Sequence, residues 1–414
     1  MFKWFAKRQG GPTPPRSSGD PWHRIISDLE YLQRAHARAH PWLADMDPGA
    51  RDEAFEERFF QHFYATMRQA GLTQASYDDW HREIAQAFKA KPFSRYEDPL
   101  AHMWLQQMSG EIHAACQRVG VGLPKQPVFG LLQTGRINGI AADVDNPGYY
   151  LILIDDGVLG FANLLAKVVA ACFPVEEESG GGLTFRTDQA SVAAERLRNP
   201  APGQRFFDLL TAYAVGGAPH AAQPYLLATR HLHLVEVLRD SMEFFIFGHE
   251  FGHCAAGHLQ GAPRQHLQMA ENGGGEIGML RPDNWEKEFE ADFLGLVLAL
   301  NVMQSKGYSP SLTYAGIELV FTGIDFMQRT LSVLEHGEER PRPLDTHPPA
   351  VERRQMLRQH TEQMFDTQLQ ASALDFSDTV TECLDFYWPA AVSVLRQMHA
   401  DGIRPHARWR QVQH

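Results

Sequence analysis

The sequence predicts an α+β fold that is mostly helical, with one small antiparallel sheet. Apolar residues recur at steps of three or four from Trp22 to about Val119, and again through most of the chain after Leu159, as in helices that bury one face. Between these regions, β-branched and apolar runs at residues 128–144 and 149–154 flank a turn and predict strands. A chain of 414 residues with 44% hydrophobic residues can bury a large core around them.

Breaks in this pattern divide the chain into four parts. Residues 1–20 are rich in Gly, Pro and Ser and predict a disordered tail, and residues 21–122 predict an N-terminal helical region that packs against the rest. Residues 123–360 predict the functional domain, with an insertion at about residues 174–222, and residues 361–414 a C-terminal helical region with a break at Pro389. Helices are expected at residues 159–172, 231–258, 282–304 and 310–334, and loops at residues 261–281 and 337–349.

Composition excludes several classes of protein. The formal net charge of −12, without a dense basic run beyond residues 3–16, makes nucleic acid an unexpected partner. No signal peptide and no apolar stretch long enough for a transmembrane helix is present. The scattered cysteines form no metal or disulfide pattern and fit a reducing cytoplasm (Cys116, Cys172, Cys254, Cys383).

An HExxH signature lies at residues 249–253. His249 and His253 are four residues apart, so on a helix both imidazoles lie on one face and can reach one metal ion. Glu250 lies one position round the helix, beside the water that such an ion would hold. Apolar residues at steps of three or four lead into the histidines, which predicts a helix with a buried ligand face (Leu234, Leu238, Met242, Phe245). The pattern is typical of zinc hydrolases, and two core histidines beside a solvated glutamate are the alternative.

A catalytic zinc ion usually has three protein ligands, so a third is expected. His258 falls one position short of the third histidine of metzincins, and we expect it at the helix end or behind a ligand. Glu288 and Asp292 share one face of the next predicted helix, so one can bind the metal while the other accepts the N–H of a ligand histidine. Acidic residues also offset the dipole at the start of a helix, which accounts for Glu286 but poorly for Asp292.

The HExxH motif and the acidic motif that follows it together resemble those of the gluzincin metallopeptidases, specifically of the HtpX and CAAX-prenyl-protease type. In that family HExxH is followed by E-x-x-A-D, here residues 288–292. Residues 346–353 (Thr-His-Pro-Pro-Ala-Val-Glu-Arg) are similar to a downstream family element, and residues 135–141 (Gly-Arg-Ile-Asn-Gly-Ile-Ala) to its edge strand. The similarity covers about residues 128–357 without the insertion. The chain departs from the family in Gly139, where alanine is usual, in the insertion, and in lacking the membrane spans of the best-known members.

The resemblance implies a zincin-like catalytic domain with an HExxH helix and one Zn²⁺ per chain. His249, His253 and Glu288 are the implied zinc ligands, and Glu250 is the implied general base. Asp292 is implied to hold a ligand histidine.

The resemblance also implies roles for residues around the metal. His347 is implied to help stabilise the oxyanion, and Arg353 to brace the loop that carries it. Asn138, Gly139 and Ile140 are implied to form the edge to which an extended protein or peptide substrate adds as a strand. A turn histidine before two prolines is the alternative for His347, and a strand-end turn residue the alternative for Asn138.

The sequence therefore predicts a soluble, cytoplasmic, zinc-dependent metalloendopeptidase, with its substrate identity and oligomeric state left open. One alternative is an effector that cuts a single host protein, similar to the phage-exclusion Lit-type proteases. Another is an interaction scaffold with a structural zinc ion. The presence of Glu250 argues against a scaffold, because a structural site does not need that carboxylate.

Overall fold

The computed structural model describes residues 20–39, 96–177, 183–260, 282–340 and 348–409, together with scattered residues between 57 and 94. This part of the chain is mostly helical and contains a small sheet, as expected. None of its helices has the length and apolar composition that a bilayer span requires. Residues 1–19 of the predicted tail, the predicted loop at residues 261–281 and the segment 341–347 with His347 lie outside the described residues.

The described elements follow one another in a simple order. They are α1 (Pro21–Ala39), α5 (Pro99–Val119), β1 (Gln126–Leu132), β2 (Gly139–Ala142), β3 (Tyr149–Asp155), α6 (Asp156–Ala170), β4 (Val175–Glu177), β5 (Leu183–Phe185), α7 (Gln189–Arg198), α8 (Ala201–Ala214), η3 (Pro219–Ala221), η4 (Thr229–His231), α9 (Leu232–Ala255), α11 (Pro282–Ser305), α12 (Pro310–His336), α13 (Ala350–Met364), α14 (Thr367–Ala400) and η5 (Ala407–Trp409).

The sheet of β1, β2 and β3 is mixed, so the prediction of an antiparallel sheet was wrong. β3 lies in the centre, parallel to β1 and antiparallel to β2, in the order β1-β3-β2. The predicted strand at residues 128–144 is two strands, β1 and β2, which do not pair with each other. The continuous apolar run of β3 is explained by burial on both faces, which is common in parallel arrangements.

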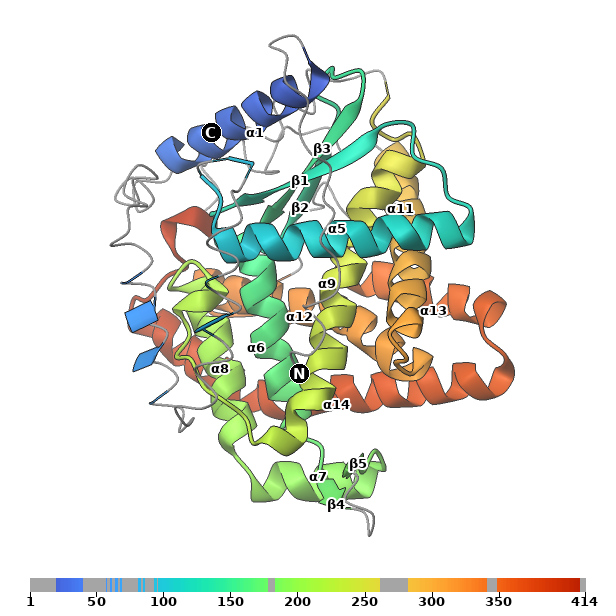
Figure 1. Cartoon of the computed structure of the whole chain (residues 1–414). Coiled ribbons are helices and arrows are strands. Elements are labelled where there is room, and N and C mark those ends of the chain that lie inside the picture. The colour runs from blue at the N-terminus through green and yellow to red at the C-terminus, as the bar shows by residue number, and fades with distance from the viewer. Residues whose placement is uncertain are drawn as a thin grey trace.

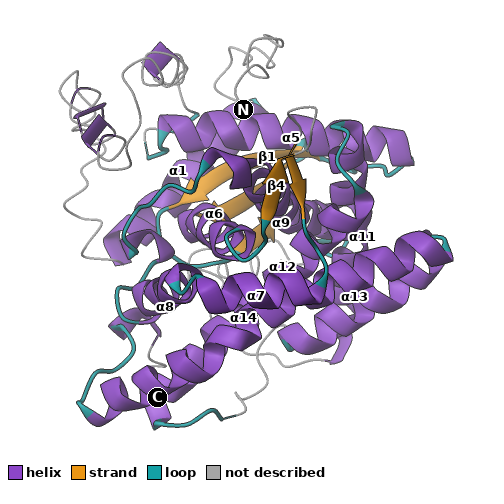
Figure 2. Cartoon of the chain, turned by 90° about the horizontal axis from the view of Figure 1, so that it is seen from below, coloured by secondary structure: helices purple, strands orange, loops and turns teal. Residues whose placement is uncertain are grey.

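Both faces of the sheet are covered by helices. One face packs against Trp22, Ile25, Leu29 and Leu32 of α1, which lies across the strands in Figure 1. The other face packs against the helical body, where the ring of Phe129 in β1 lies 5.5 Å from that of Phe247 and 5.4 Å from that of Phe251, both in α9. Seen at right angles, the helices enclose the strands (Figure 2). The sheet thus fixes the position of α9.

The helices behind the sheet share one large core. α9 packs against α6, α11 and α12, and α14 runs along α12. The region predicted as an insertion contains the hairpin β4–β5 and α7, which lie at the end of the molecule opposite to α1 (Figure 1). It also contains α8, whose apolar face is buried in the main core (Phe206, Leu209, Leu210). Part of this region therefore belongs to the body of the fold.

The predicted helix break at Pro389 was wrong, because α14 continues through that residue. A proline inside a helix removes the hydrogen bond to the carbonyl four residues earlier, here that of Asp385. Pro389 and Asp385 are both exposed, so water can reach that carbonyl. The flanking residues Tyr387, Trp388 and Ala391 are buried, and their packing holds the helix together.

Two aspartates at the junction of β3 and α6 hold the turn that precedes β2. The hydroxyl of Thr134 donates to Asp155 Oδ1 (2.5 Å), and the N–H of Gly135 donates to Asp156 Oδ1 (2.6 Å). Asp155 is 1% exposed, and its second oxygen has no hydrogen-bond partner among the described residues. Burial therefore raises the pKa of Asp155 to about 8, against smaller opposing effects that include the Thr134 hydrogen bond.

This pKa predicts that Asp155→Asn stabilises the protein more at pH 8 than at pH 5. A carboxyl whose pKa is raised by folding contributes full stability below its unfolded pKa and loses it as the pH rises through its folded pKa, so the loss falls between about pH 4 and pH 8. Asparagine mimics the neutral acid, and we expect a gain of about 1 kcal/mol or more at pH 8 in chemical unfolding. Exposed Asp188, whose pKa is lowered to about 2 mainly by the Ser191 backbone N–H, is the control, since Asp188→Asn should give no such gain. An equal effect of Asp155→Asn at both pH values would contradict the assignment.

Candidate metal centre

The two histidines of the HExxH signature lie on one face of α9. The apolar stripe that precedes them is buried as the sequence predicts, with Leu234, Leu238, Met242 and Phe245 all 0–1% exposed. His249 continues this stripe and is 6% exposed. The Nε2 atoms of His249 and His253 lie 3.1 Å apart and face the same space. Both histidines therefore offer a nitrogen to one position at a buried wall.

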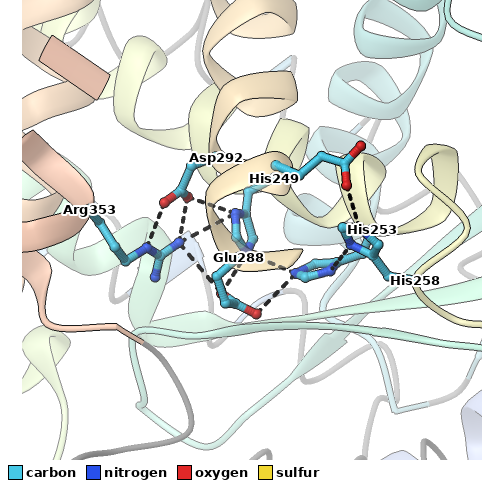
Figure 3. Close-up of polar contacts among 7 residues, drawn as sticks. His249, His253, His258, Glu288, Asp292 and Arg353 are labelled. Carbon is cyan, nitrogen blue, oxygen red and sulfur yellow. Dashed lines mark hydrogen bonds and ion pairs between the residues drawn. The ribbon is translucent and has the colours of Figure 1, made fainter. Parts of the chain in front are cut away.

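Helix α11 brings Glu288 to the same position. Its carboxylate oxygens lie 3.5 Å from His249 Nε2 and 3.4 Å from His253 Nε2 (Figure 3). Glu288 is 7% exposed, whereas Glu286 and Glu290 on the same helix are exposed. Of the described glutamates Glu286, Glu288 and Glu290, only Glu288 lies beside the Nε2 atoms of both histidines.

The spacing of these donors fits a metal ion. One donor atom from each of the three residues lies within 4.8 Å of the others. Donors that each lie about 2.1 Å from one tetrahedral zinc ion are roughly 3.4 Å from each other, close to the separations of 3.1, 3.4 and 3.5 Å here. Two imidazoles and one carboxylate are also a donor set that zinc accepts with a position left open. The three residues could hold such an ion.

Small residues allow α9 and α11 to approach closely enough for this geometry. A Cβ added at Gly252 would lie 3.0 Å from the Cα and carbonyl oxygen of Ala291. A Cβ added at Gly295 would lie 2.9 Å from the backbone nitrogen of His249, and one at Gly248 3.2 Å from the Cα of Gly295. The atoms in contact belong to the backbone, so larger side chains would force the helices apart.

Asp292 and Arg353 hold His249 from behind. Asp292 is 1% exposed, and its Oδ1 lies 2.9 Å from His249 Nδ1. Arg353, on α13, donates to both carboxylate oxygens of Asp292, at 2.8 and 2.6 Å. Its Nη2 also lies 3.3 Å from His249 Nδ1, but both atoms are donors when Nε2 binds a metal, so the hydrogen bond of His249 is assigned to Asp292. Arg353 thus braces a carboxylate, and through it a candidate ligand.

The electrostatics of the site favour positive charge. Burial opposes the imidazolium form of His249, but hydrogen bonds to Asp292 and Glu288 outweigh it and raise the pKa of His249 to about 10. Burial acts to raise the pKa of Asp292, yet the nearby Arg353 guanidinium keeps that pKa below its usual value. The same two carboxylates would favour a metal cation at His249 Nε2.

Glu250 lies beside the sheet edge rather than among the three donors. It is 5% exposed, and a Cβ added at Gly139 in β2 would lie 2.6 Å from Glu250 Oε1. Glycine at this position therefore leaves room for the carboxylate. The edge strand and Glu250 are direct neighbours.

The backbone of β2 is suited to accept another strand. Among the described residues β2 pairs only with β3. The carbonyl of Asn138 accepts the N–H of Asp155 at 3.0 Å, and hydrogen-bonded positions alternate along an antiparallel pair. The N–H and C=O groups of Gly139 and Ala141 therefore point away from β3. Ile140 is 7% exposed and anchors the strand in the core.

His258 lies on the outer side of His253, away from His249 and Glu288. Its Nδ1 lies 3.0 Å from His253 Nδ1, and its Nε2 lies 3.0 Å from Glu290 Oε2 (Figure 3). Burial lowers the pKa of His258 in spite of the Glu290 carboxylate, which favours a neutral ring. The sequence did not predict the contact between His258 and Glu290. It also did not predict the small residues between α9 and α11, although two pairs of small residues at a spacing of four indicate a close helix contact (Gly248 and Gly252, Ala291 and Gly295).

Comparison with known proteins returned no relative: no protein-family model, no curated protein and no solved structure matches the chain. The geometry of the site is therefore the basis on which a function can be assigned.

Glu288→Ala should weaken zinc binding far more than Glu286→Ala. Loss of Glu288 removes one of three converging donors, whereas Glu286 is exposed, and its loss changes only the charge near the helix start, worth a few tenths to about 1 kcal/mol. Competition with a chromophoric chelator measures both affinities. Equal affinities in the two variants would remove Glu288 from the site.

Gly295→Ala should weaken zinc binding without changing any donor. The added methyl group would meet the backbone of α9, and such overpacking costs about 1–3 kcal/mol. We expect about a tenfold or greater loss of zinc affinity and a lower melting temperature. Gly110→Ala in α5 is the matched control, because a Cβ there meets nothing within 4 Å. If both variants bound zinc like the wild type, helix spacing would not determine the site.

Proposed function

We propose that this protein is a cytoplasmic, zinc-dependent metalloendopeptidase that cleaves protein substrates in extended conformation. The observation that carries the proposal is the convergence of His249, His253 and Glu288 at one buried point, with Glu250 next to them on α9. Two imidazoles and a carboxylate form the ligand set of several zinc peptidases. The presence of a glutamate between the ligands supports a hydrolytic rather than a structural ion.

The edge of β2 supports a peptide substrate. A chain that adds to this edge as a strand would hydrogen-bond to the outward-facing backbone groups of Gly139 and Ala141. The Glu250 carboxylate packs against Gly139, so a peptide bond held there would pass beside it. Binding through the main chain recognises extended segments of many sequences, and side-chain pockets would then select among them.

Each residue of the centre has a role in the proposed reaction. A zinc ion held by His249, His253 and Glu288 would supply an activated water molecule and positive charge for the developing oxyanion. Glu250 takes the proton of the attacking water and delivers it to the leaving amine nitrogen. Asp292 accepts the N–H of His249 and keeps its Nε2 directed at the centre, while Arg353 keeps Asp292 in place and ionised.

Glu250→Gln should retain zinc and lose nearly all proteolysis. The amide keeps the shape of the carboxylate but cannot take the proton of water, so we expect cleavage to fall by roughly 10²- to 10⁴-fold. Zinc content by atomic emission and the appearance of new N-termini in a proteome-derived peptide library measure the two properties. Activity within a few-fold of the wild type would exclude Glu250 as the base.

The wild type alone distinguishes the alternative functions. Wild-type protein that binds zinc but cleaves nothing, in that library or in native cell extract, would favour the interaction scaffold. Cleavage of a single protein would favour the effector.

A further inference from the structure

The two candidate ligand histidines are supported in different ways. The outer nitrogen of His249 meets Asp292, a buried carboxylate fixed by Arg353. The outer nitrogen of His253 meets the ring of His258, and the far nitrogen of that ring meets the carboxylate of Glu290. Figure 3 shows His258 on the side of His253 that is turned away from Glu288.

Hydrogen-bond chemistry determines which nitrogen carries the proton in His253 and in His258, the two rings that connect the metal position to Glu290. If His253 Nε2 faces a metal ion, its proton is on Nδ1 and must be donated at 3.0 Å to His258 Nδ1. His258 Nδ1 can accept only when it carries no proton, so the proton of neutral His258 is on Nε2. That N–H lies 3.0 Å from Glu290 Oε2, which accepts it. Every donor meets an acceptor in this arrangement, and it leaves His253 Nε2 free for a metal.

The end of α9 places His258 for this contact. The helix ends at Ala255, and Gly257 has a φ of 74°, a left-handed conformation that glycine adopts without strain. The turn brings the N–H of His258 back to the carbonyl of His253 at 3.1 Å. The His258 side chain is 7% exposed, so its ring is held by packing. The Glu290 side chain, the last of the three residues in contact, is 60% exposed and lies at the surface. Helix α11 supplies both Glu288 and Glu290, on the two sides of His253.

We infer that His258 is a positioning residue of the metal centre: it accepts the Nδ1–H of His253 and thereby directs His253 Nε2 at the position shared with His249 and Glu288. Glu290 holds His258 in the tautomer that can accept. The inference rests on the metal site of the proposed function and is independent of the reaction catalysed there. Partners of this kind typically change metal affinity by about 10- to 100-fold.

The test compares His258→Phe and His258→Asn in the full-length chain. Phenylalanine keeps a ring but accepts no hydrogen bond, so zinc affinity by chelator competition should fall by about 10- to 100-fold. Asparagine Oδ1 can accept from His253, so that variant should bind zinc within about threefold of the wild type. The melting temperature of each zinc-free variant reports any loss of packing. Wild-type affinity in the phenylalanine variant, or equal weakening in both variants, would overturn the inference.

A second measurement does not depend on the variants. Histidine-selective ¹⁵N spectra of the zinc-loaded wild type should show the proton on Nδ1 of His253 and on Nε2 of His258. A proton on Nδ1 of His258 would overturn the inference while leaving the metal site intact. Failure of the wild type to bind zinc would instead refute the proposed function, and the inference with it.

Discussion

The structure depends on the close contact between α9 and α11. Each helix offers small residues to the other, so their backbones approach at Gly252, Ala291 and Gly295. Only at this separation can Glu288 come within 3.5 Å of both histidine nitrogens. The contact also sets where Asp292 meets His249 and where Glu290 meets His258. Two supports and one donor therefore follow from the same pair of helices.

The sheet and the other helices hold α9 and α11 in position. β1 presents Phe129 to α9, and α1 covers the opposite face of the strands, so α9 is fixed between the sheet and α11. Arg353 reaches the site from α13, where its guanidinium also lies over the Phe321 ring of α12, at 4.9 Å from the ring centre. Helices distant in sequence thus contribute charge to the centre, and the Arg353 guanidinium offsets part of the negative charge of Glu288 and Asp292.

Much of the architecture around the centre follows from local sequence pattern. The helices that carry His249 and Glu288 were predictable from the local sequence, because apolar residues at steps of three or four lead into His249 and the chain turns apolar after Asp292. The strand order was not, since β3 is buried on both faces and its apolar run does not reveal the direction of its partners. The helix break predicted at Pro389 was wrong because the destabilisation that a proline causes inside a helix depends on whether the unpaired carbonyl can reach water. The partner of His258 depends on a turn at Gly257 and on how α11 is rotated, and both are set by tertiary packing.

The origin of the donors on two separate helices has a consequence for the energetics of the whole chain. A metal ion that binds only the folded protein adds its binding energy to the free energy of unfolding, about 4 kcal/mol when its free concentration is a thousand times its dissociation constant. Here the ion would link α9 to α11, so it would stabilise the packing of these two helices as well as act as a cofactor. Metal supply would then govern how much of the protein is folded, and scarcity of the ion would lower the amount of folded protein.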